Sequence, residues 1–312
     1  MSLYLCAPVY FKTAEGARHT VSDALDRYSR DVLPHKPRTA PFQKRQLEWW
    51  RKQVGHLLLV DLTAPRIVEC RARLLSELGS RNQRRGSSTA NRYVAALSHV
   101  LSVAVREWEW VDDNPARRVT KLREPRGRAR FLSDDERNRL LAACRASAAP
   151  GLHAVVVLAL ATGMRRNEIM SLTRSQIDLD RGLITLDVTK NGERRCVPLA
   201  AYPRSALEEH LKRCSTDTGL LFPGTKRERP FDLRKPWAAA IRKAGLADFR
   251  FQDLRHTTAS YLAMTAAQAT DIAAVLGHKT LAMVKRYTHL ADSHVHKVVA
   301  AMNERIFSHD QP

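Results

Sequence analysis

The spacing of hydrophobic residues predicts that the first part of the chain is helical. Over residues 89–110, apolar side chains recur at the three- and four-residue intervals of one helix face, and a Ser or Thr at 87–89 would cap the start. Residues 21–33 and 42–54 repeat this spacing, with Arg and Lys on the opposite side. The sequence therefore predicts a basic bundle of four or five helices.

A second set of helical patterns begins after residue 130. Ser133 and Glu136 have the spacing of a helix-capping box. The run at 152–161, apolar on all sides and ended by Gly163, indicates a buried helix. Helical spacing also marks four later stretches, at residues 204–213, 237–244, 254–266 and 270–276.

One hairpin is predicted among these helices. Residues 183–188 alternate with period two, and a second such stretch follows at 195–199 after the turn sequence KNGE. The fold class that follows is mainly α with a small antiparallel sheet.

Residues 121–130 (KLREPRGRAR) interrupt the hydrophobic pattern. The stretch combines several Arg with a Lys, a Pro and a Gly, and it has no apolar face to bury. We expect an exposed basic linker here, which joins a helical domain at 1–120 to a second domain at 131–312.

The charge of the chain indicates a polyanionic partner. Lys and Arg number 52 and Asp and Glu 32, so the formal net charge is +20, and 39 of the basic residues are Arg. Guanidinium groups bind phosphate in a bidentate way, which favours nucleic acid over an anionic membrane surface. The alternative is a highly charged surface that serves only solubility.

Several other classes of protein are not indicated. No apolar run approaches the ~20 residues of a transmembrane helix, and the first residues do not resemble a secretory signal. The five Cys lack CxxC spacing, which argues against a disulfide framework and against a zinc or other metal site. We expect a soluble protein of the reducing cytoplasm, with no membrane partner.

Four separated segments carry unusual polar groups. Arg165 and Glu168 follow the buried helix, and Lys190 lies at the hairpin tip. Arg255 opens a later helix, and Tyr287 follows the segment LGHKTLAMVKR. Each group alone has a purely structural explanation: an ion pair, a solvated turn, a helix start or core packing.

Together, in this order, the four segments resemble the tyrosine recombinase (phage integrase) family of site-specific DNA recombinases. TGMRRNEI is similar to the first-arginine box, TKNGERRCVPL to the lysine hairpin, FQDLRHT to the second-arginine box and LGHKTLAMVKRYTHL to the His–Tyr end. The resemblance covers residues 131–290. It implies a helical core-binding domain and a mixed α/β catalytic domain, with Arg165 and Arg255 as phosphate-binding arginines, Lys190 as general acid, His278 as a supporting group and Tyr287 as nucleophile.

The chemistry of these residue types agrees with the implied roles. Two guanidiniums can stabilise the charge that grows on an attacked phosphodiester. A Tyr hydroxyl has an ordinary pKa near 10, so it needs a cationic site to become a nucleophile. Attack yields a covalent phosphotyrosine that keeps the bond energy for rejoining. No step requires a metal or another cofactor.

The sequence departs from the family at one position. Gln252 stands where the second-arginine box usually has His, and an amide cannot carry a proton. His256 follows Arg255 as in many family members, so we do not expect it to be a substitute. Glu168, Gln252 and His256 are interpreted as supporting groups.

The implied partner is double-stranded DNA. We expect Arg84, Arg85, Arg126, Arg128 and Arg130 to contact it, in a homotetramer on two recombination sites that integrates, excises or inverts a mobile element. An amphipathic C-terminal helix at 295–307 would dock on a neighbouring subunit or on its own domain. The alternatives are a type IB topoisomerase-like enzyme and a non-catalytic DNA-binding relative.

Overall fold

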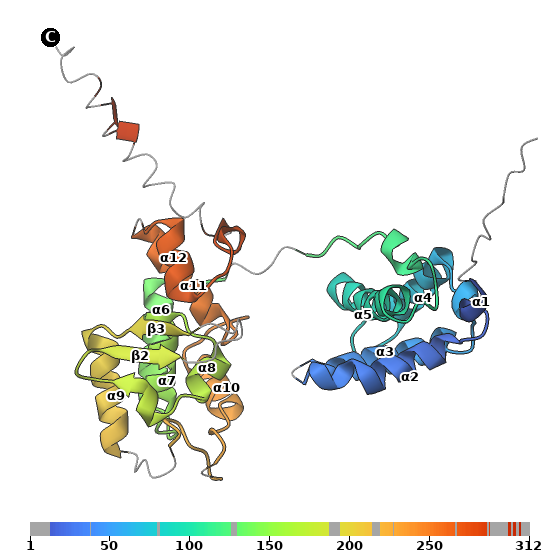
Figure 1. Cartoon of the computed structure of the whole chain (residues 1–312). Coiled ribbons are helices and arrows are strands. Elements are labelled where there is room, and N and C mark those ends of the chain that lie inside the picture. Colours follow the sequence, from blue (N-terminus) through green and yellow to red (C-terminus); the bar gives the residue numbers. More distant parts are fainter. Residues whose placement is uncertain are drawn as a thin grey trace, which may run out of the picture. The chain divides into compact units, whose positions relative to one another are not determined.

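The chain divides into two compact units, Met1–Gly127 and Arg128–Pro312, called unit 1 and unit 2 below (Figure 1). A computed structural model describes residues 13–37, 39–79, 82–125, 130–186, 194–213, 219–226, 228–265, 267–285, 287, 299–300, 302–303 and 306. Each unit has a hydrophobic core of its own. No helix within these described ranges is long and apolar enough to cross a membrane.

Unit 1 is a bundle of helices, and the structure confirms the three predicted ones. Trp50 and Tyr28 are fully buried at its centre, where the Trp50 indole donates a hydrogen bond of 2.7 Å to the Tyr93 carbonyl. The expected Ser or Thr cap is wrong: the helix that begins at Ser87 has Gly86 as N-cap, without a capping side chain. The helices are α1 (Thr13–Gly16), α2 (Val21–Asp31), α3 (Ala40–Val54), α4 (Ala64–Ser76) and α5 (Ser87–Arg106), with 3-10 turns η1 (Leu33–His35), η2 (Leu59–Asp61) and η3 (Pro115–Arg118).

Unit 2 is built around one buried helix, α7, against which α6, α8, α9 and α11 pack (Figure 1). The predicted capping box is present at the start of α6, where Ser133 and Glu136 bond reciprocally to each other's backbone N–H. The helices are α6 (Asp134–Arg145), α7 (Leu152–Thr162), α8 (Arg166–Met170), α9 (Ala201–Arg213), α10 (Arg234–Lys243), α11 (Asp253–Met264) and α12 (Ala269–Leu276), with 3-10 turns η4 (Arg174–Gln176) and η5 (Leu281–Met283).

Gly163 ends α7 in the left-handed region, with φ of 61°. An L side chain is strained there, and an added Cβ would lie 2.3 Å from Cδ2 of the fully buried Leu276, which would have to shift. The chain turns sharply at this glycine, so that only three residues separate the end of α7 from the start of α8.

A three-stranded antiparallel sheet in the order β1-β2-β3 covers the core of unit 2. Its strands are β1 (Ile177–Asp178), β2 (Leu183–Leu186) and β3 (Arg195–Pro198), so the structure confirms the predicted hairpin and adds β1. The register pairs Ile184 with Val197 and Leu186 with Arg195. Ile184, Leu186 and Val197 are buried, which places Arg195 on the inward face of its strand. The hairpin tip lies outside the described residues.

The described ends of the 121–130 segment are bound to their own units. The Leu122 N–H donates to Asn91 of α5, which also donates to Glu124. Arg130 forms a 2.5 Å ion pair with Glu136, and its guanidinium lies over the Phe249 ring. The expectation of an exposed stretch is therefore wrong at Arg130, whose side chain is 30% exposed.

The Arg130–Glu136 pair should make the stability of unit 2 depend on pH. The hydrogen bond from Arg130 lowers the pKa of Glu136 from 4.5 to about 2, against the opposing effect of burial. Because the pKa is lower in the folded state, the stabilisation is fully present above pH 4.5 and is lost as the pH falls through about 2. We expect Glu136→Gln to lower the free energy of unfolding by about 1–2 kcal/mol at pH 7 and by less at pH 3.

Urea unfolding followed by circular dichroism at the two pH values measures this difference. Glu208→Gln is the matched control, because Glu208 accepts from Arg204 at 3.0 Å in an exposed pair. That variant should change the unfolding free energy by less than about 0.5 kcal/mol. An equal loss for Glu136→Gln at both pH values would contradict the assignment.

Candidate active site

Arg165 and Glu168 lie at the turn that Gly163 creates. Arg165 is the N-cap residue of α8, and its backbone N–H donates to Glu168 at 2.9 Å. The Arg165 guanidinium donates to the other carboxylate oxygen of Glu168 at 2.8 Å. Glu168 thus holds the Arg165 backbone and side chain together within a single helical turn.

Arg255 reaches the same turn from the first turn of α11. Its side chain is 5% exposed and donates to the Gly163 carbonyl at 2.6 Å. Burial, and then the nearby charges of Arg165 and Arg195, lower the pKa of Arg255 to about 10. Arg255 is still protonated at neutral pH, and its Nη2 is buried without a hydrogen-bond partner in the described part of the chain. A buried cationic donor in this state favours an anion as ligand.

Arg195 is a third guanidinium that the sequence reasoning missed. It donates to Glu168 at 3.1 Å and to the Val275 carbonyl, near the end of α12, at 3.2 Å. Its side chain is 14% exposed, and burial lowers its pKa. Arg195 thus joins the hairpin to the α8 turn and to α12. The sequence did contain a signal for this residue. Arg195 lies two residues before the apolar Val197 in the predicted strand, and alternate residues of a strand face the same side, here the inward one.

Glu168 is the shared acceptor of these arginines. Burial raises the pKa of its carboxyl, but the hydrogen bonds from the Arg165 backbone and side chain and the charge of Arg195 outweigh that effect, so the pKa lies below its ordinary value. One ionised carboxylate therefore faces Arg165, Arg195 and, at longer range, Arg255. One negative charge and three positive charges give the site a net positive charge.

Tyr287 is buried beside this cluster, with 3% of its surface exposed. Its hydroxyl lies 2.5 Å from Nδ1 of His256, which follows Arg255 on α11. Small residues of α11, Ala259 and Ala263, pack in the same cluster as the phenol ring, with α12 on another side. Tyr287 also contributes to the electrostatic environment of Arg255. The structure thus brings together Arg165, Glu168, Arg255, His256 and Tyr287.

Of the other three predicted site residues, the structure describes Gln252 and His278. Gln252 is exposed at the N-cap position of α11, and its side chain makes no capping bond. His278 is half-buried and follows Gly277, the left-handed residue that ends α12. Lys190 lies outside the described residues, so its role as general acid stays a prediction.

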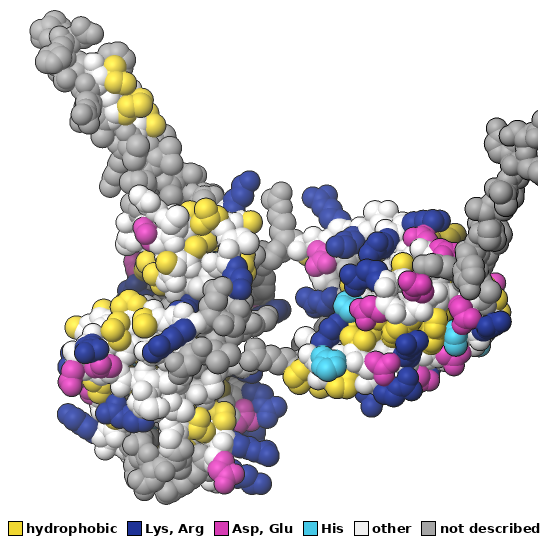
Figure 2. Space-filling model, viewed as in Figure 1, with side chains coloured by type: hydrophobic (Ala, Val, Ile, Leu, Met, Phe, Trp, Pro, Cys, Tyr) yellow, Lys and Arg dark blue, Asp and Glu magenta, His cyan; other side chains and the backbone are white. Residues whose placement is uncertain are grey.

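The arginines predicted to contact DNA differ in their surroundings. Arg84 is exposed in unit 1. Arg85 forms a 2.5 Å ion pair with Glu77 and lies over the Tyr93 ring, and Arg130 is held by Glu136. Arg126 and Arg128 lie outside the described residues. Figure 2 shows Lys and Arg side chains spread over the visible faces of both units.

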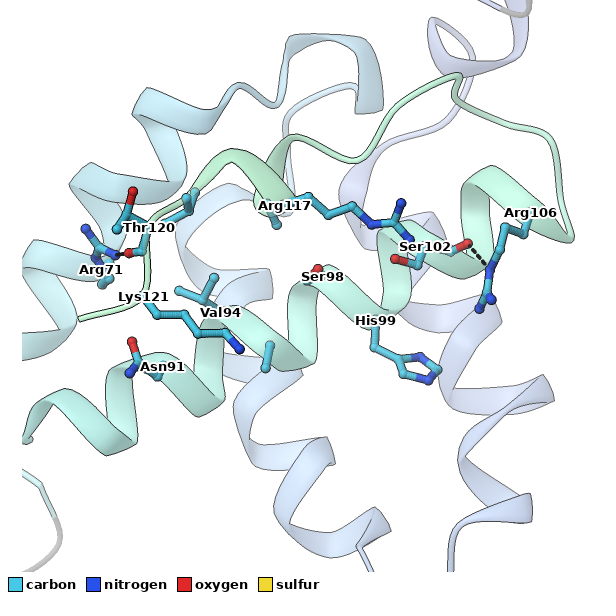
Figure 3. A pocket seen from close by; sticks show the side chains of 13 residues that line it. Arg71, Asn91, Val94, Ser98, His99, Ser102, Arg106, Arg117, Thr120 and Lys121 are labelled. Carbon is cyan, nitrogen blue, oxygen red and sulfur yellow. Dashed lines mark hydrogen bonds between the residues drawn. The ribbon is translucent and has the colours of Figure 1, made fainter. Parts of the chain in front are cut away.

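Unit 1 also contains a basic hollow of about 480 Å³ along α5 (Figure 3). Its cationic lining comes from Arg71, Arg106, Arg117 and Lys121. Arg71 is fixed by donation to the Thr120 carbonyl at 2.5 Å. The sequence reasoning missed this group because it joins α4, α5 and the segment around η3, which are far apart in the chain. The polar residues of α5 that line it are Asn91, Ser98, His99 and Ser102.

Comparisons with known proteins identify the family. Residues 130–294 match the phage integrase family. The shufflon-specific DNA recombinase of Escherichia coli is 30% identical over 284 residues, which cover 87% of this chain and 69% of that protein. The integrase of Salmonella phage P22 is 30% identical over 221 residues, 67% of this chain and 55% of its own length.

A solved structure shares the fold. The lambda integrase tetramer bound to a Holliday junction superposes with a TM-score of 0.66 at 21% identity, over 90% of this chain and 83% of that one. The fold class is therefore confirmed, and the chain belongs to the phage integrase family of tyrosine recombinases.

Arg195 should stabilise the fold through its hydrogen bonds to Glu168 and to the Val275 carbonyl. Arg195→Lys keeps the charge, but a single ammonium cannot replace the fork that binds both Glu168 and the Val275 carbonyl. We expect the free energy of unfolding to fall by about 1–3 kcal/mol, measured by urea unfolding. Arg213→Lys is the control, in an exposed pair with Glu209, and should change it by less than about 0.5 kcal/mol. Equal effects of the two substitutions would show that these two hydrogen bonds are not stabilising.

Proposed function

We propose that this protein is a site-specific DNA recombinase that cleaves and rejoins double-stranded DNA through a covalent 3′-phosphotyrosine intermediate. The observation that carries the proposal is a Tyr hydroxyl buried beside a cluster of guanidiniums, one of which has a buried nitrogen, Arg255 Nη2, with no hydrogen-bond partner among the described residues. Such a site suits a phosphodiester, which has negatively charged oxygens for the guanidiniums to bind and an electrophilic phosphorus for the hydroxyl to attack. The process served is integration, excision or inversion of a mobile element, in the cytoplasm.

Phosphate binding is the first function of the cluster. Arg165 and Arg255 come from different helices, and both are fixed before any ligand arrives, by Glu168 and by the Gly163 carbonyl. Donors fixed in advance stabilise the charge that develops on the non-bridging oxygens without reorganising during the reaction. Arg195 keeps Glu168 in place and adds to the positive potential.

Bond exchange is the second function. The hydroxyl of Tyr287 loses its proton to a base as its oxygen bonds to phosphorus, the bond from phosphorus to the 5′ oxygen breaks, and that oxygen takes a proton from Lys190. His278 supports the phosphate. The phosphotyrosine keeps the energy of the broken bond, so a 5′ hydroxyl from another strand can reverse the step.

DNA is held in part by unit 1. The hollow along α5 offers Arg71, Arg106, Arg117 and Lys121 to phosphate oxygens, and exposed Arg84 adds a further contact. These contacts are independent of the catalytic cluster. Removal of a catalytic group should therefore affect cleavage more than binding.

Assembly into a homotetramer on two sites is proposed from the family. The solved lambda integrase structure is a tetramer on a Holliday junction. In this chain, Val299, Met302 and Ile306 are helical and each more than two-fifths exposed. Their side chains are available to a neighbouring subunit, whereas packing on their own domain would cover them.

Removal of the Tyr287 hydroxyl should abolish the covalent adduct. In Tyr287→Phe, folding and DNA binding should persist, because only one oxygen is lost and phosphate contacts lie elsewhere. The measurement is formation of a denaturant-resistant protein–DNA complex on a nicked suicide substrate. Tyr261→Phe is the matched control, since the Tyr261 hydroxyl donates to Asp134 and accepts from Arg137, neither of which belongs to the candidate site, and it should form adduct at the normal rate.

Adduct formation by Tyr287→Phe would identify another nucleophile and refute the assignment. Relaxation of supercoiled DNA by the wild type without strand exchange would favour the topoisomerase alternative. Specific binding with no adduct in the wild type would favour a non-catalytic relative.

Loss of a phosphate-binding arginine should affect cleavage more than binding. Arg165→Ala or Arg255→Ala should raise the barrier to cleavage by about 2–4 kcal/mol, the scale for one fixed oxyanion donor. Gel-shift affinity should fall far less. Arg181→Ala, at an 80% exposed side chain paired with Asp178, should leave the cleavage rate unchanged. Equal losses in binding and cleavage would show that Arg165 and Arg255 are ordinary backbone contacts.

A further inference from the structure

His256 makes a contact that its position in the sequence did not suggest. Its Nδ1 lies 2.5 Å from the Tyr287 hydroxyl oxygen, across 31 residues of chain. The two rings are tilted by 43°, with centroids 5.9 Å apart. The imidazole therefore meets the hydroxyl through its nitrogen lone pair or N–H and does not stack on the ring.

Helix geometry explains why this residue can reach the tyrosine. His256, Ala259 and Ala263 recur at the intervals of one face of α11, and both alanines belong to the cluster that contains Tyr287. Their small side chains leave room for the phenol ring beside this face of α11. Gln252 precedes His256 by four residues, so it starts one turn earlier on the same face, and it is exposed.

Among the described residues, the three arginines, Glu168 and Gln252 cannot accept a proton from the phenol. Arg165, Arg195 and Arg255 are donors only. The oxygens of Glu168 already accept from Arg165 and Arg195. Gln252 has an amide, which does not take up a proton at any ordinary pH. Imidazole is the side chain suited to this transfer near neutral pH.

We propose that His256 is the catalytic base that receives the phenolic proton of Tyr287, in place of the histidine that Gln252 replaces. This inference rests on the proposed recombinase function. In the step, the Tyr287 O–H bond breaks and its proton passes to Nδ1 of His256. The oxygen forms the new bond to phosphorus, the bond from phosphorus to the 5′ oxygen breaks, and that oxygen takes a proton from Lys190. In rejoining, His256 returns its proton to the departing phenolate.

Two substitutions separate proton transfer from positioning. His256→Asn keeps a hydrogen-bonding amide near the place of Nδ1 but cannot take up a proton, and His256→Ala removes both properties. We expect both variants to form adduct about 10²- to 10⁴-fold more slowly than the wild type on a nicked suicide substrate, at equal site occupancy. An Asn variant within about threefold of the wild type would show that His256 only positions the phenol, and would overturn the proposal.

Two further measurements test the direction of the proton. Free imidazole should accelerate His256→Ala, where a space has been opened, and should not accelerate His256→Asn. A substrate with sulfur at the 5′ bridging position has a leaving group that needs no proton. It should restore Lys190→Ala and leave both His256 variants slow. Restoration of the His256 variants by this substrate would mean that His256 is the acid for the leaving group, and would also overturn the proposal.

The controls keep this proposal distinct from the function on which it rests. His56→Asn, at an exposed position in unit 1, should cleave at the wild-type rate. Circular dichroism and gel-shift affinity verify that the His256 variants fold and bind. Absence of adduct from the wild type refutes the recombinase function itself, whereas a normal rate in both His256 variants refutes only the role of His256.

Discussion

The buried carboxylate of Glu168 is the constraint on which the candidate active site depends. It accepts hydrogen bonds from the Arg165 backbone, the Arg165 guanidinium and Arg195. Through Arg195 it is linked to the hairpin and to the Val275 carbonyl of α12. A single ionised group thus fixes three segments that are distant in sequence. The negative charge of Glu168 is tolerated in the interior because each carboxylate oxygen accepts a hydrogen bond from a guanidinium.

The cluster of Glu168 and the three arginines contains more positive than negative charge. Arg255 is held by a carbonyl dipole and not by a carboxylate, so its charge is only partly compensated, and its pKa falls to about 10. The folded protein tolerates this because α7 and the α8 turn fix the surrounding groups. An incoming phosphate would supply the missing charge, and the energy of that neutralisation becomes available for binding and for the developing transition state.

Local patterns in the sequence predict most of this architecture. Ser133 with Glu136, and the apolar run closed by Gly163, specify their elements because each signal lies within a few neighbouring residues. Arg165 and its partner Glu168 are recognisable for the same reason. Arg195 was not found, because its importance comes from strand pairing that turns it inward.

His256 shows the other limit of sequence reasoning. Its identity is plain, but its contact with Tyr287 depends on how α11, α12 and the following 3-10 turn pack together, which no spacing in the sequence encodes. The basic hollow along α5 has the same character, since α4, α5 and the segment around η3 each contribute to it. The two-residue strand β1 is too short to produce an alternating pattern. Tertiary packing, more than local propensity, determines these features.

Gly163 has a consequence for how the protein can vary. Three features fall on this one residue: its positive φ, the 2.3 Å approach of a hypothetical Cβ to Leu276, and the hydrogen bond that its carbonyl accepts from Arg255. A substitution at Gly163 should disturb packing and the candidate site together. Any displacement of the backbone would also move the Gly163 carbonyl, which accepts a hydrogen bond from Arg255. By contrast, we expect single substitutions of exposed arginines in ion pairs, such as Arg213 with Glu209, to change stability little. At Gly163 the addition of one methyl group would affect folding and reactivity together.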